Sequence, residues 1–146
     1  MTEDARCGGS IIPTLRCTDG PGAIEWLGAA FGFAPHLVIS NEDGSIAHAE
    51  LTLGDAMIML GSAAGEGDYR KWVQPPARPD DVVHFGIYVV TPDVEAHYAR
   101  ALAHGVEVLL PLTEQSYGGS DYTCRDLQGY VWTFGSYDPW TAPPSE

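Results

Sequence analysis

The chain repeats one order of predicted elements, and this duplication limits the folds that it can form. The segment "LGDAMIMLGS", which begins at Leu53, aligns without a gap with "LQGYVWTFGS", which begins at Leu127. The opening strands of the two halves match at an offset of about 72 residues, longer than the period of solenoid repeats. The sequence therefore predicts a duplicated module rather than a solenoid.

Each half contains a strand, a helix and then three strands. In the first half, "SIIPTLRCTD" is apolar at alternate positions, and "GPGAIEWLGAAFGF" has helical spacing with Pro21 near its start and Gly32 near its end. The strands "HLVIS", "SIAHAELTL" and "AMIMLGS" follow. The second half repeats this order with "VVHFGIYVV", "DVEAHYARALAHG", "VEVLLPL", "SDYTCRD" and "YVWTFGS". We expect an α+β fold in which two βαβββ modules form a curved mixed sheet, a half-barrel with its helices outside.

The boundaries of the modules follow from turn residues and composition. We expect one structural domain with a flexible leader at residues 1–9, a first module at 10–63, a second module at 82–137 and a flexible tail at 138–146. Residues 64–81 are rich in Gly and Pro and are predicted to form a linker or lid loop.

Composition excludes several classes of partner. The formal net charge is −13, from 20 acidic and 7 basic residues, so the chain lacks the clustered Lys and Arg of a nucleic-acid-binding protein. An acidic surface attracts a cationic ligand, although it also serves simply to keep a protein soluble. We expect no membrane association, because no apolar run approaches about 20 residues. The start of the chain lacks a basic and apolar leader, so we expect a cytoplasmic protein.

The three cysteines indicate neither a disulfide framework nor a zinc site, because they are widely spaced and form no CxxC pair. Cys7 lies in the leader. Cys17 lies in an apolar strand and is expected in the core. Cys124 stands beside Arg125, whose charge can lower the pKa of a nearby thiol, but the sequence places no base near it, and we assign it no catalytic role.

Alternation along the strands predicts which side chains share a face. Phe85 and Ile87 are expected to pack against the helix of the second half, as are Trp132 and Phe134. The opposite, inner face is expected to carry Ile12, Thr14, Arg16, Met57, Met59, His84, Tyr88 and Thr133. An apolar wall with a few polar groups is typical of a small-molecule pocket, and the alternative is a face filled by its own side chains. Trp72, Tyr117 and Tyr122 are candidates for stacking on a flat ligand.

Four segments in this order resemble the vicinal oxygen chelate superfamily, which includes glyoxalase I, bleomycin-resistance proteins, fosfomycin-resistance enzymes and extradiol dioxygenases. They are "IIPTLRCTD…AIEWLGAAFGF", "HAELTLGDAMIML", "VHFGIYV…DVEAHYARALAHGVEVLLPL" and "YTCRDLQGYVWTFGSY". Together they cover nearly all of residues 10–137. The resemblance implies a glyoxalase/bleomycin-resistance/dihydroxybiphenyl-dioxygenase-like fold and a homodimer, with modules paired within one chain or swapped between two. The "RDLQG" turn departs from the family's usual Asp-Pro-x-Gly, with Leu127 in place of the proline.

The resemblance also places the metal ligands of the family's enzymes at Ile12, Met59, His84 and Thr133. Of these residue types only histidine binds a divalent metal well, whereas a catalytic site of this kind needs about three protein ligands. We therefore expect no metal cofactor. His48 and Glu50 lie two residues apart on one strand face, and if that face is the inner one they offer a rebuilt metal site. His36, His97 and His104 are assigned no chemistry.

Two functions of different classes follow. The resemblance favours a metal-free protein of the bleomycin-resistance type that sequesters a small cationic or aromatic ligand, with Arg16, His84 and Thr133 as hydrogen-bonding groups. The alternative is a lyase, isomerase or oxygenase with an altered metal site or with His84 as general base. A regulatory or scaffold dimer whose cleft has lost its function is a third possibility.

Overall fold

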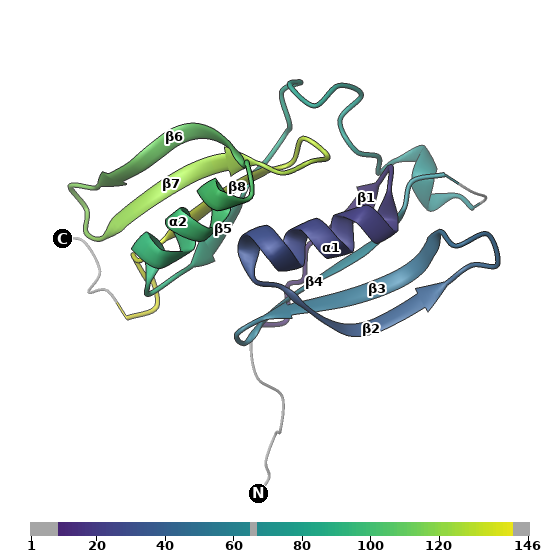
Figure 1. Cartoon of the computed structure of the whole chain (residues 1–146), viewed down its shortest axis with the longest axis horizontal. Coiled ribbons are helices and arrows are strands. Elements are labelled where there is room, and N and C mark those ends of the chain that lie inside the picture. The colour runs from purple at the N-terminus through teal and green to yellow at the C-terminus, as the bar shows by residue number, and fades with distance from the viewer. Residues whose placement is uncertain (1–8, 65–66, 142–146) are drawn as a thin grey trace, which may run out of the picture. The chain divides into compact units, whose positions relative to one another are not determined.

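The protein is represented by a computed structural model, which describes residues 9–64 and 67–141. The chain divides into two compact units, residues 1–75 and 76–146. Each unit contains one four-stranded sheet and one α-helix (Figure 1). The expected leader, the end of the tail and Cys7 fall largely or wholly outside the described residues.

The first unit follows the predicted order of elements. It contains β1 (Thr14–Cys17), α1 (Gly20–Phe31), β2 (Ala34–Ser40), β3 (Ile46–Leu53), β4 (Ala56–Ser62) and a short 3₁₀ helix η1 (Tyr69–Lys71). The strand order is β1-β4-β3-β2, with β1 parallel to β4 and the other pairs antiparallel. The strand β2 is therefore an edge strand, and all seven of its residues are exposed.

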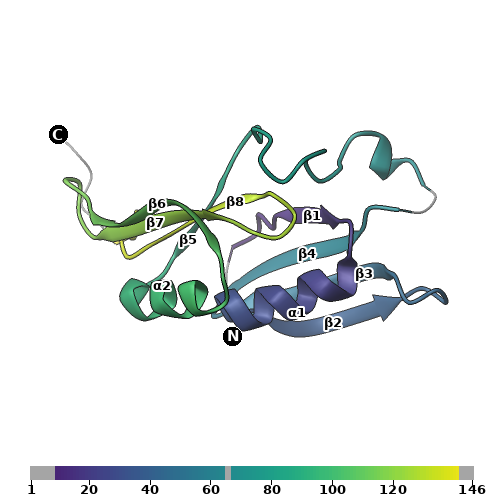
Figure 2. The same ribbon diagram turned by 45° about the horizontal axis from the view of Figure 1, so that its top comes forward.

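The second unit repeats this topology. It contains β5 (Ile87–Val90), α2 (Val94–Ala103), β6 (Glu107–Glu114), β7 (Ser120–Arg125) and β8 (Val131–Gly135). The strand order is β5-β8-β7-β6, with β5 parallel to β8. In Figure 2 this sheet is seen nearly edge-on, and α2 lies along one face of it. The α+β class and the two βαβββ modules are confirmed.

Local sequence signals explain where the helices begin and end. Asp19 caps α1 by accepting a hydrogen bond from the backbone N–H of Gly22 at 3.0 Å, and Asp93 caps α2 by accepting one from Ala96 at 3.3 Å. Gly32 ends α1 at φ 91°, a left-handed conformation that glycine adopts without a steric cost. The helices therefore begin and end close to the predicted positions.

The core of each unit lies between its helix and one face of its sheet. In the first unit, β3 and β4 alternate between buried residues, such as Leu51, Ile58 and Leu60, and half-buried residues on the other face. In the second unit, Trp132 and Phe134 are fully buried beneath α2, as predicted, and their rings stack at 5.8 Å. The predicted parity of these strands is confirmed.

The opening strand of the second unit is shorter than predicted. The strand β5 begins at Ile87, so His84 and Phe85 precede it, and Phe85 is 78% exposed rather than packed against the helix. The reason is the length of its partner, because β8 begins at Val131 and its pairing with β5 starts at Trp132 and Ile87. Residues before Gly86 would have to pair with the turn that precedes β8.

Arg125 does not activate the thiol of Cys124. The side chain is fully buried, and burial raises the pKa of its thiol to about 12, with Asp126 adding to the effect. The neighbouring Arg125 does not lower it, because adjacent residues in a strand point to opposite faces. Cys17 is buried in the first unit as predicted. Among the described residues, no helix has the length and apolar character needed to cross a membrane.

Candidate functional site

Each sheet has one face that no helix of its own unit covers, and the candidate site residues lie on these faces. Cross-strand partners share a face. In the first sheet Met59 is the partner of Thr14 and Glu50, and Met57 is the partner of Thr52. We call this surface the first open face; its side chains are Thr14, Arg16, Leu37, Ile39, His48, Glu50, Thr52, Met57 and Met59. The second open face consists of Tyr88, Val90, Leu110, Asp121, Thr123, Arg125, Val131 and Thr133.

His48 and Glu50 lie on the first open face, which answers the question that the sequence left open. They are the cross-strand partners of Ile39 and Met59. The Nε2 atom of His48 and the Oε2 atom of Glu50 are 2.9 Å apart, and both side chains are partly exposed. A carboxylate at this distance fixes the orientation of the imidazole by a hydrogen bond. The pair can therefore exchange a proton or hydrogen bonds with a molecule on this face.

Arg16 connects the first open face to the segment after β4. Its guanidinium donates a hydrogen bond to the carbonyl of Ser62 and lies 5.6 Å from the centre of the Tyr69 ring. This cation–π contact holds η1 near the end of the sheet. Sequence reasoning missed Tyr69, although an aromatic residue beside the basic pair Arg70 and Lys71 was a signal. Trp72 follows η1 and is 76% exposed.

The second open face carries hydroxyl groups at its centre. The Oγ1 atoms of Thr123 and Thr133 are 2.8 Å apart. Thr133 is also the strand partner of Tyr88, whose hydroxyl donates a hydrogen bond to the carbonyl of Tyr137 at 2.8 Å. A Cβ at Gly135 would collide with the Tyr88 hydroxyl, so only glycine at that position lets the Tyr88 ring lie across the sheet.

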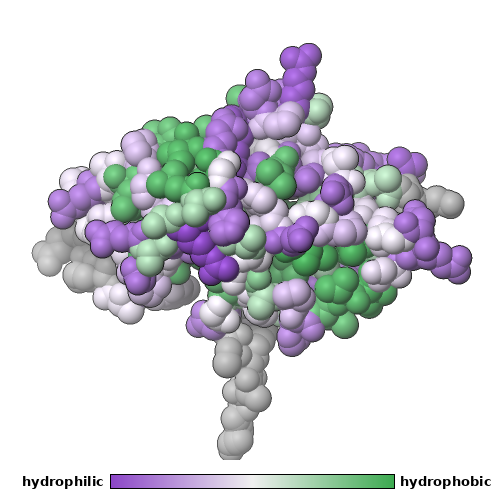
Figure 3. Space-filling view, viewed as in Figure 1, coloured by the Kyte–Doolittle hydropathy of each residue, from purple (hydrophilic) through white to green (hydrophobic). Residues whose placement is uncertain are grey.

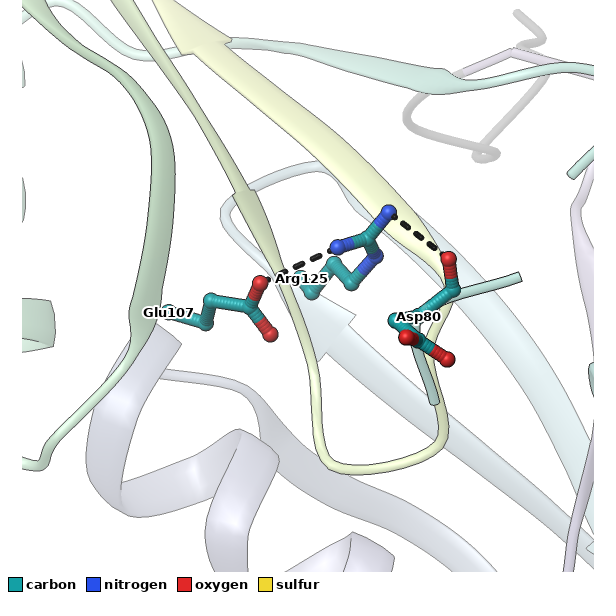
Figure 4. A network of polar contacts seen from close by, with 3 residues as sticks. All are labelled: Asp80, Glu107 and Arg125. Carbon is teal, nitrogen blue, oxygen red and sulfur yellow. Dashed lines mark hydrogen bonds and ion pairs between the residues drawn. The ribbon is translucent and has the colours of Figure 1, made fainter. Parts of the chain in front are cut away.

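Arg125, the last residue of β7, connects the second open face to the loop before β5. Arg125 donates to the Oε2 atom of Glu107 at 3.0 Å and to the carbonyl of Asp80 at 3.4 Å (Figure 4). The same loop packs on the turn before β8, because a Cβ at Gly129 would lie 2.9 Å from the carbonyl of Pro79. The last part of the expected linker, up to Asp81, is thus attached to the second unit.

Three residues expected at the site do not lie on a strand of either open face. His84 is exposed and precedes β5, so it is not on a strand face. Tyr122 is fully buried and cannot stack on a ligand, because its hydroxyl is 2.6 Å from the Nδ1 atom of His97 and its ring stacks on Phe134 at 5.5 Å. Tyr117 is exposed, as stacking requires, but lies in the turn after β6 rather than in a strand. Alternation along β7 is the sequence signal for this placement, because Tyr122 and Cys124 are two residues apart and share the buried face.

The residues present do not fit the metal of the family's enzymes. Met59 and Thr133 lie on the open faces as predicted, but a thioether and a neutral hydroxyl are poor ligands for a hard divalent ion, and Ile12 has no donor atom. Within residues 9–64 and 67–141, no three His, Cys, Asp or Glu side chains are close enough together to hold a metal ion. His48 and Glu50 supply only two donors.

The sequence model of the Glyoxalase/Bleomycin resistance protein/Dioxygenase superfamily matches residues 11–134. The chain belongs to this superfamily. Its fold is that of TioX from Micromonospora sp. ML1, with 30% sequence identity, a TM-score of 0.65 and coverage of 88% of this chain and 98% of TioX. It is 26% identical over 126 residues to an uncharacterized protein of Mycobacterium bovis, Mb0911c, covering 86% of this chain and 82% of that protein.

Two further solved structures show the fold alone, because their identity to this chain is low. A bleomycin resistance determinant encoded on transposon Tn5 is 14% identical, with a TM-score of 0.64 and coverage of 90% of this chain and 99% of the determinant. A mutant of the fosfomycin resistance protein FosX from Listeria monocytogenes, complexed with Mn(II), is 16% identical, with a TM-score of 0.62 and coverage of 90% and 92%. The same fold thus occurs in a drug-resistance determinant and in a metal-bound protein, so the fold alone does not decide the function.

Proposed function

We propose that the protein is a metal-free binding protein that sequesters a small, antibiotic-like molecule on its open sheet faces. One observation carries this proposal: the open faces present Met59 and Thr133 where the superfamily's metal enzymes are expected to have ligands. Such side chains contribute contact area and hydrogen bonds but not metal affinity.

The first open face has the composition of a small-molecule surface. Met57 and Met59 are half-buried and flexible, so they can adapt to ligands of different shape. Leu37 and Ile39 extend the apolar area at the edge strand. The His48–Glu50 pair adds one polar group that can fix the orientation of a ligand. Apolar walls with a few placed polar groups favour binding over nucleic-acid or ion recognition.

We also propose that the protein forms a homodimer, as the family resemblance implies. Exposed apolar side chains gather over the edge strands β2 and β6 (Figure 3), namely Leu37, Val38, Ile39 and Leu110. An exposed apolar edge strand is a site at which another chain can pair. Size-exclusion chromatography with light scattering tests this proposal: a monomer at all concentrations would contradict it.

Two measurements test the binding proposal. Elemental analysis of protein purified without chelators should find no stoichiometric transition metal, and a stoichiometric metal would overturn the metal-free part. A thermal-shift screen with cationic glycopeptides and intercalating peptides should then identify a ligand. A ligand present at 100 times its dissociation constant adds about 2.7 kcal/mol to the free energy of unfolding.

A pair of variants connects that ligand to the open faces. Thr133→Trp should abolish the thermal shift, because a bulky ring would occupy the centre of the second open face. Met59→Trp tests the first open face in the same way. Ala99→Trp, on the exposed surface of α2, is the control and should bind like the wild type. If both open-face variants bind normally while remaining folded, the ligand binds elsewhere.

The His48–Glu50 pair favours one alternative, an enzyme that transfers a proton. An imidazole oriented by a carboxylate is a competent general base when a substrate lies within hydrogen-bonding distance. Turnover of a glutathione or thiol adduct by the wild type, lost in His48→Gln, would support this alternative. Absence of turnover together with a ligand from the thermal-shift screen would leave the binding function as the better explanation.

A further inference from the structure

Three tyrosines surround one carboxylate at the end of the second open face where β7 begins. We call Tyr88, Tyr117, Tyr137 and Asp121 the tyrosine–aspartate cluster. The hydroxyl of Tyr117 donates to the Oδ2 atom of Asp121 at 2.8 Å, and the side-chain amide of Gln115 donates to the Oδ1 atom at 2.9 Å. Asp121 is thereby held in a fixed orientation.

The aromatic rings are also fixed with respect to one another. The Tyr117 and Tyr137 rings meet edge to face, with centroids 5.2 Å apart and an interplanar angle of 85°. The hydroxyl of Tyr88 is held near these two rings, because it donates a hydrogen bond to the backbone carbonyl of Tyr137. The turn that carries Tyr117 is closed by a hydrogen bond from the backbone N–H of Gln115 to the carbonyl of Gly119 at 2.8 Å. Tyr117 and Tyr88 are nevertheless 58% and 40% exposed, so their rings are accessible.

The electrostatic environment of the cluster is negative. Asp121 raises the pKa of Tyr117 to about 12, chiefly by accepting its hydrogen bond, and burial together with the charges of Asp121 and Asp138 raises the pKa of Tyr88. Arg125 lies at the opposite end of β7, about 13 Å along the strand at 3.3 Å per residue, and is paired with Glu107. Arg125 therefore pairs with Glu107 and does not form an ion pair with Asp121.

We propose that the tyrosine–aspartate cluster binds the ammonium group of an organic cation. The inference rests on the proposed binding function, since it assigns the chemical class of part of the ligand. The faces of tyrosine rings attract alkylammonium groups, and a nearby carboxylate supplies the opposite charge. Each oxygen of Asp121 already accepts one hydrogen bond, so the cluster suits a weakly hydrated alkylammonium better than an inorganic ion that needs several oxygen ligands.

Choline and 3,3-dimethylbutan-1-ol form a matched pair of probes, because they have nearly the same shape and differ in charge. Titration of the ¹⁵N-labelled protein with each, followed by amide chemical shifts, measures both affinities and locates the site. Choline should bind at least about 10-fold more tightly and shift the amides of residues 115–121 and 135–138, a ratio that corresponds to about 1.4 kcal/mol. Equal affinity for the two probes, or shifts located elsewhere, would overturn the proposal.

Variants test the role of each group. Asp121→Asn retains an oxygen for one of its two donors but removes the charge, and it should weaken choline binding at least about 5-fold. Tyr117→Leu should do the same, and its exposed position in a turn leaves the core intact. Tyr117→Phe retains the ring and should stay within about 3-fold of the wild type. Glu95→Gln removes one charge from the exposed surface of α2 and is the matched control. Unchanged choline binding by both Asp121→Asn and Tyr117→Leu would overturn the assignment.

The outcome is distinguishable from that of the proposed function. If the thermal-shift screen finds a ligand but choline does not bind at the cluster, the ammonium site is wrong and the binding function stands. If choline binds at the cluster while the screen finds no ligand, the ammonium site stands and the antibiotic-like class of ligand is wrong.

Discussion

Thr133 and Thr123 face each other across β7 and β8, with their Oγ1 atoms 2.8 Å apart on the second open face. Thr133 stands where the metal enzymes that the sequence resembles are expected to have a carboxylate ligand. In this chain the side chain at position 133 instead forms a hydrogen bond with the hydroxyl of Thr123 on the neighbouring strand. The pair is half-buried, so its contribution to the free energy of unfolding should be measurable.

The threonine pair predicts a non-additive double variant. Thr133→Val and Thr123→Val should each lower the free energy of unfolding by about 1 kcal/mol, since each leaves the remaining hydroxyl without this partner. The double variant removes both hydroxyls and should cost less than the sum of the two single variants. Urea unfolding of the four proteins measures the coupling. Strict additivity would show that the two hydroxyls do not interact.

Asp126 should be essential for the stability of the second unit. Its carboxylate accepts hydrogen bonds from the backbone N–H groups of Gln128 and Tyr130, at 2.9 and 3.0 Å, and from the Nε1 atom of Trp132 at 2.8 Å. Asp126→Ala removes the acceptor of these three hydrogen bonds and should lower the free energy of unfolding by about 3 kcal/mol, since each hydrogen bond to a charged group contributes about 1.5–3 kcal/mol and the three are not additive.

Urea unfolding of Asp126→Ala is best compared with that of Asp81→Ala. Asp81 also accepts a backbone hydrogen bond, from Arg78 at 3.0 Å, but in an exposed position, where the loss should be below about 1 kcal/mol. Similar losses in the two variants would show that burial of the Asp126 network contributes little.

Sequence patterns predicted the fold well because its signals are local and occur twice. Pro21 and Gly32 mark the start and the end of the first helix, and alternation in β4 and β8 assigns the faces of both strands correctly. The resemblance then indicated which known fold the two modules form. The length of β5 could not be predicted from its own sequence, because it depends on where β8 offers partners. Val82 to Phe85 have the composition of a strand but no strand of the sheet to pair with.

The candidate site was predicted less completely. Alternation identified Thr14, Arg16, Met57, Met59 and Thr133, all of which lie on the open faces. It could not assign His48 and Glu50, because the face of β3 is known only once its register with β4 is known. Tyr137 was placed at the end of the second module without a role, and its contact with Tyr117 depends on the turn between β6 and β7. Contacts of this kind follow from tertiary structure rather than from spacing.

Tyr122→Phe should separate structure from binding. The hydroxyl of Tyr122 is 2.6 Å from the Nδ1 atom of His97, and burial raises the pKa of Tyr122 above its ordinary value. Removing the hydroxyl should lower the free energy of unfolding by about 1 kcal/mol and leave the affinity for any ligand unchanged. Urea unfolding and a ligand titration on the same sample provide both values. A loss of ligand affinity without a loss of stability would show that Tyr122 takes part in binding.

Ionisation of the buried Cys124 thiol should lower the stability of the protein at high pH. Burial raises the pKa of its thiol from 9.0 to about 12, so the folded state favours the neutral form. The stability that this group contributes is therefore fully present below pH 9 and is lost as the pH rises from 9 toward 12. Buried thiols are also protected from alkylation. In a Cys7→Ser background, iodoacetamide at pH 8.5 should modify Cys17 and Cys124 only after unfolding.

The variant Cys124→Ala isolates the titration of this thiol from that of other groups. It lacks the ionisable group, so its urea midpoint should fall less steeply between pH 9 and pH 11 than that of the Cys7→Ser background. Cys17→Ala is the control, because it also removes a buried thiol. Rapid alkylation of Cys124 in the folded protein, or identical pH slopes with and without its thiol, would mean that solvent reaches this side of β7. Water would then reach the face of the second sheet that α2 covers, where Trp132 and Phe134 are also buried.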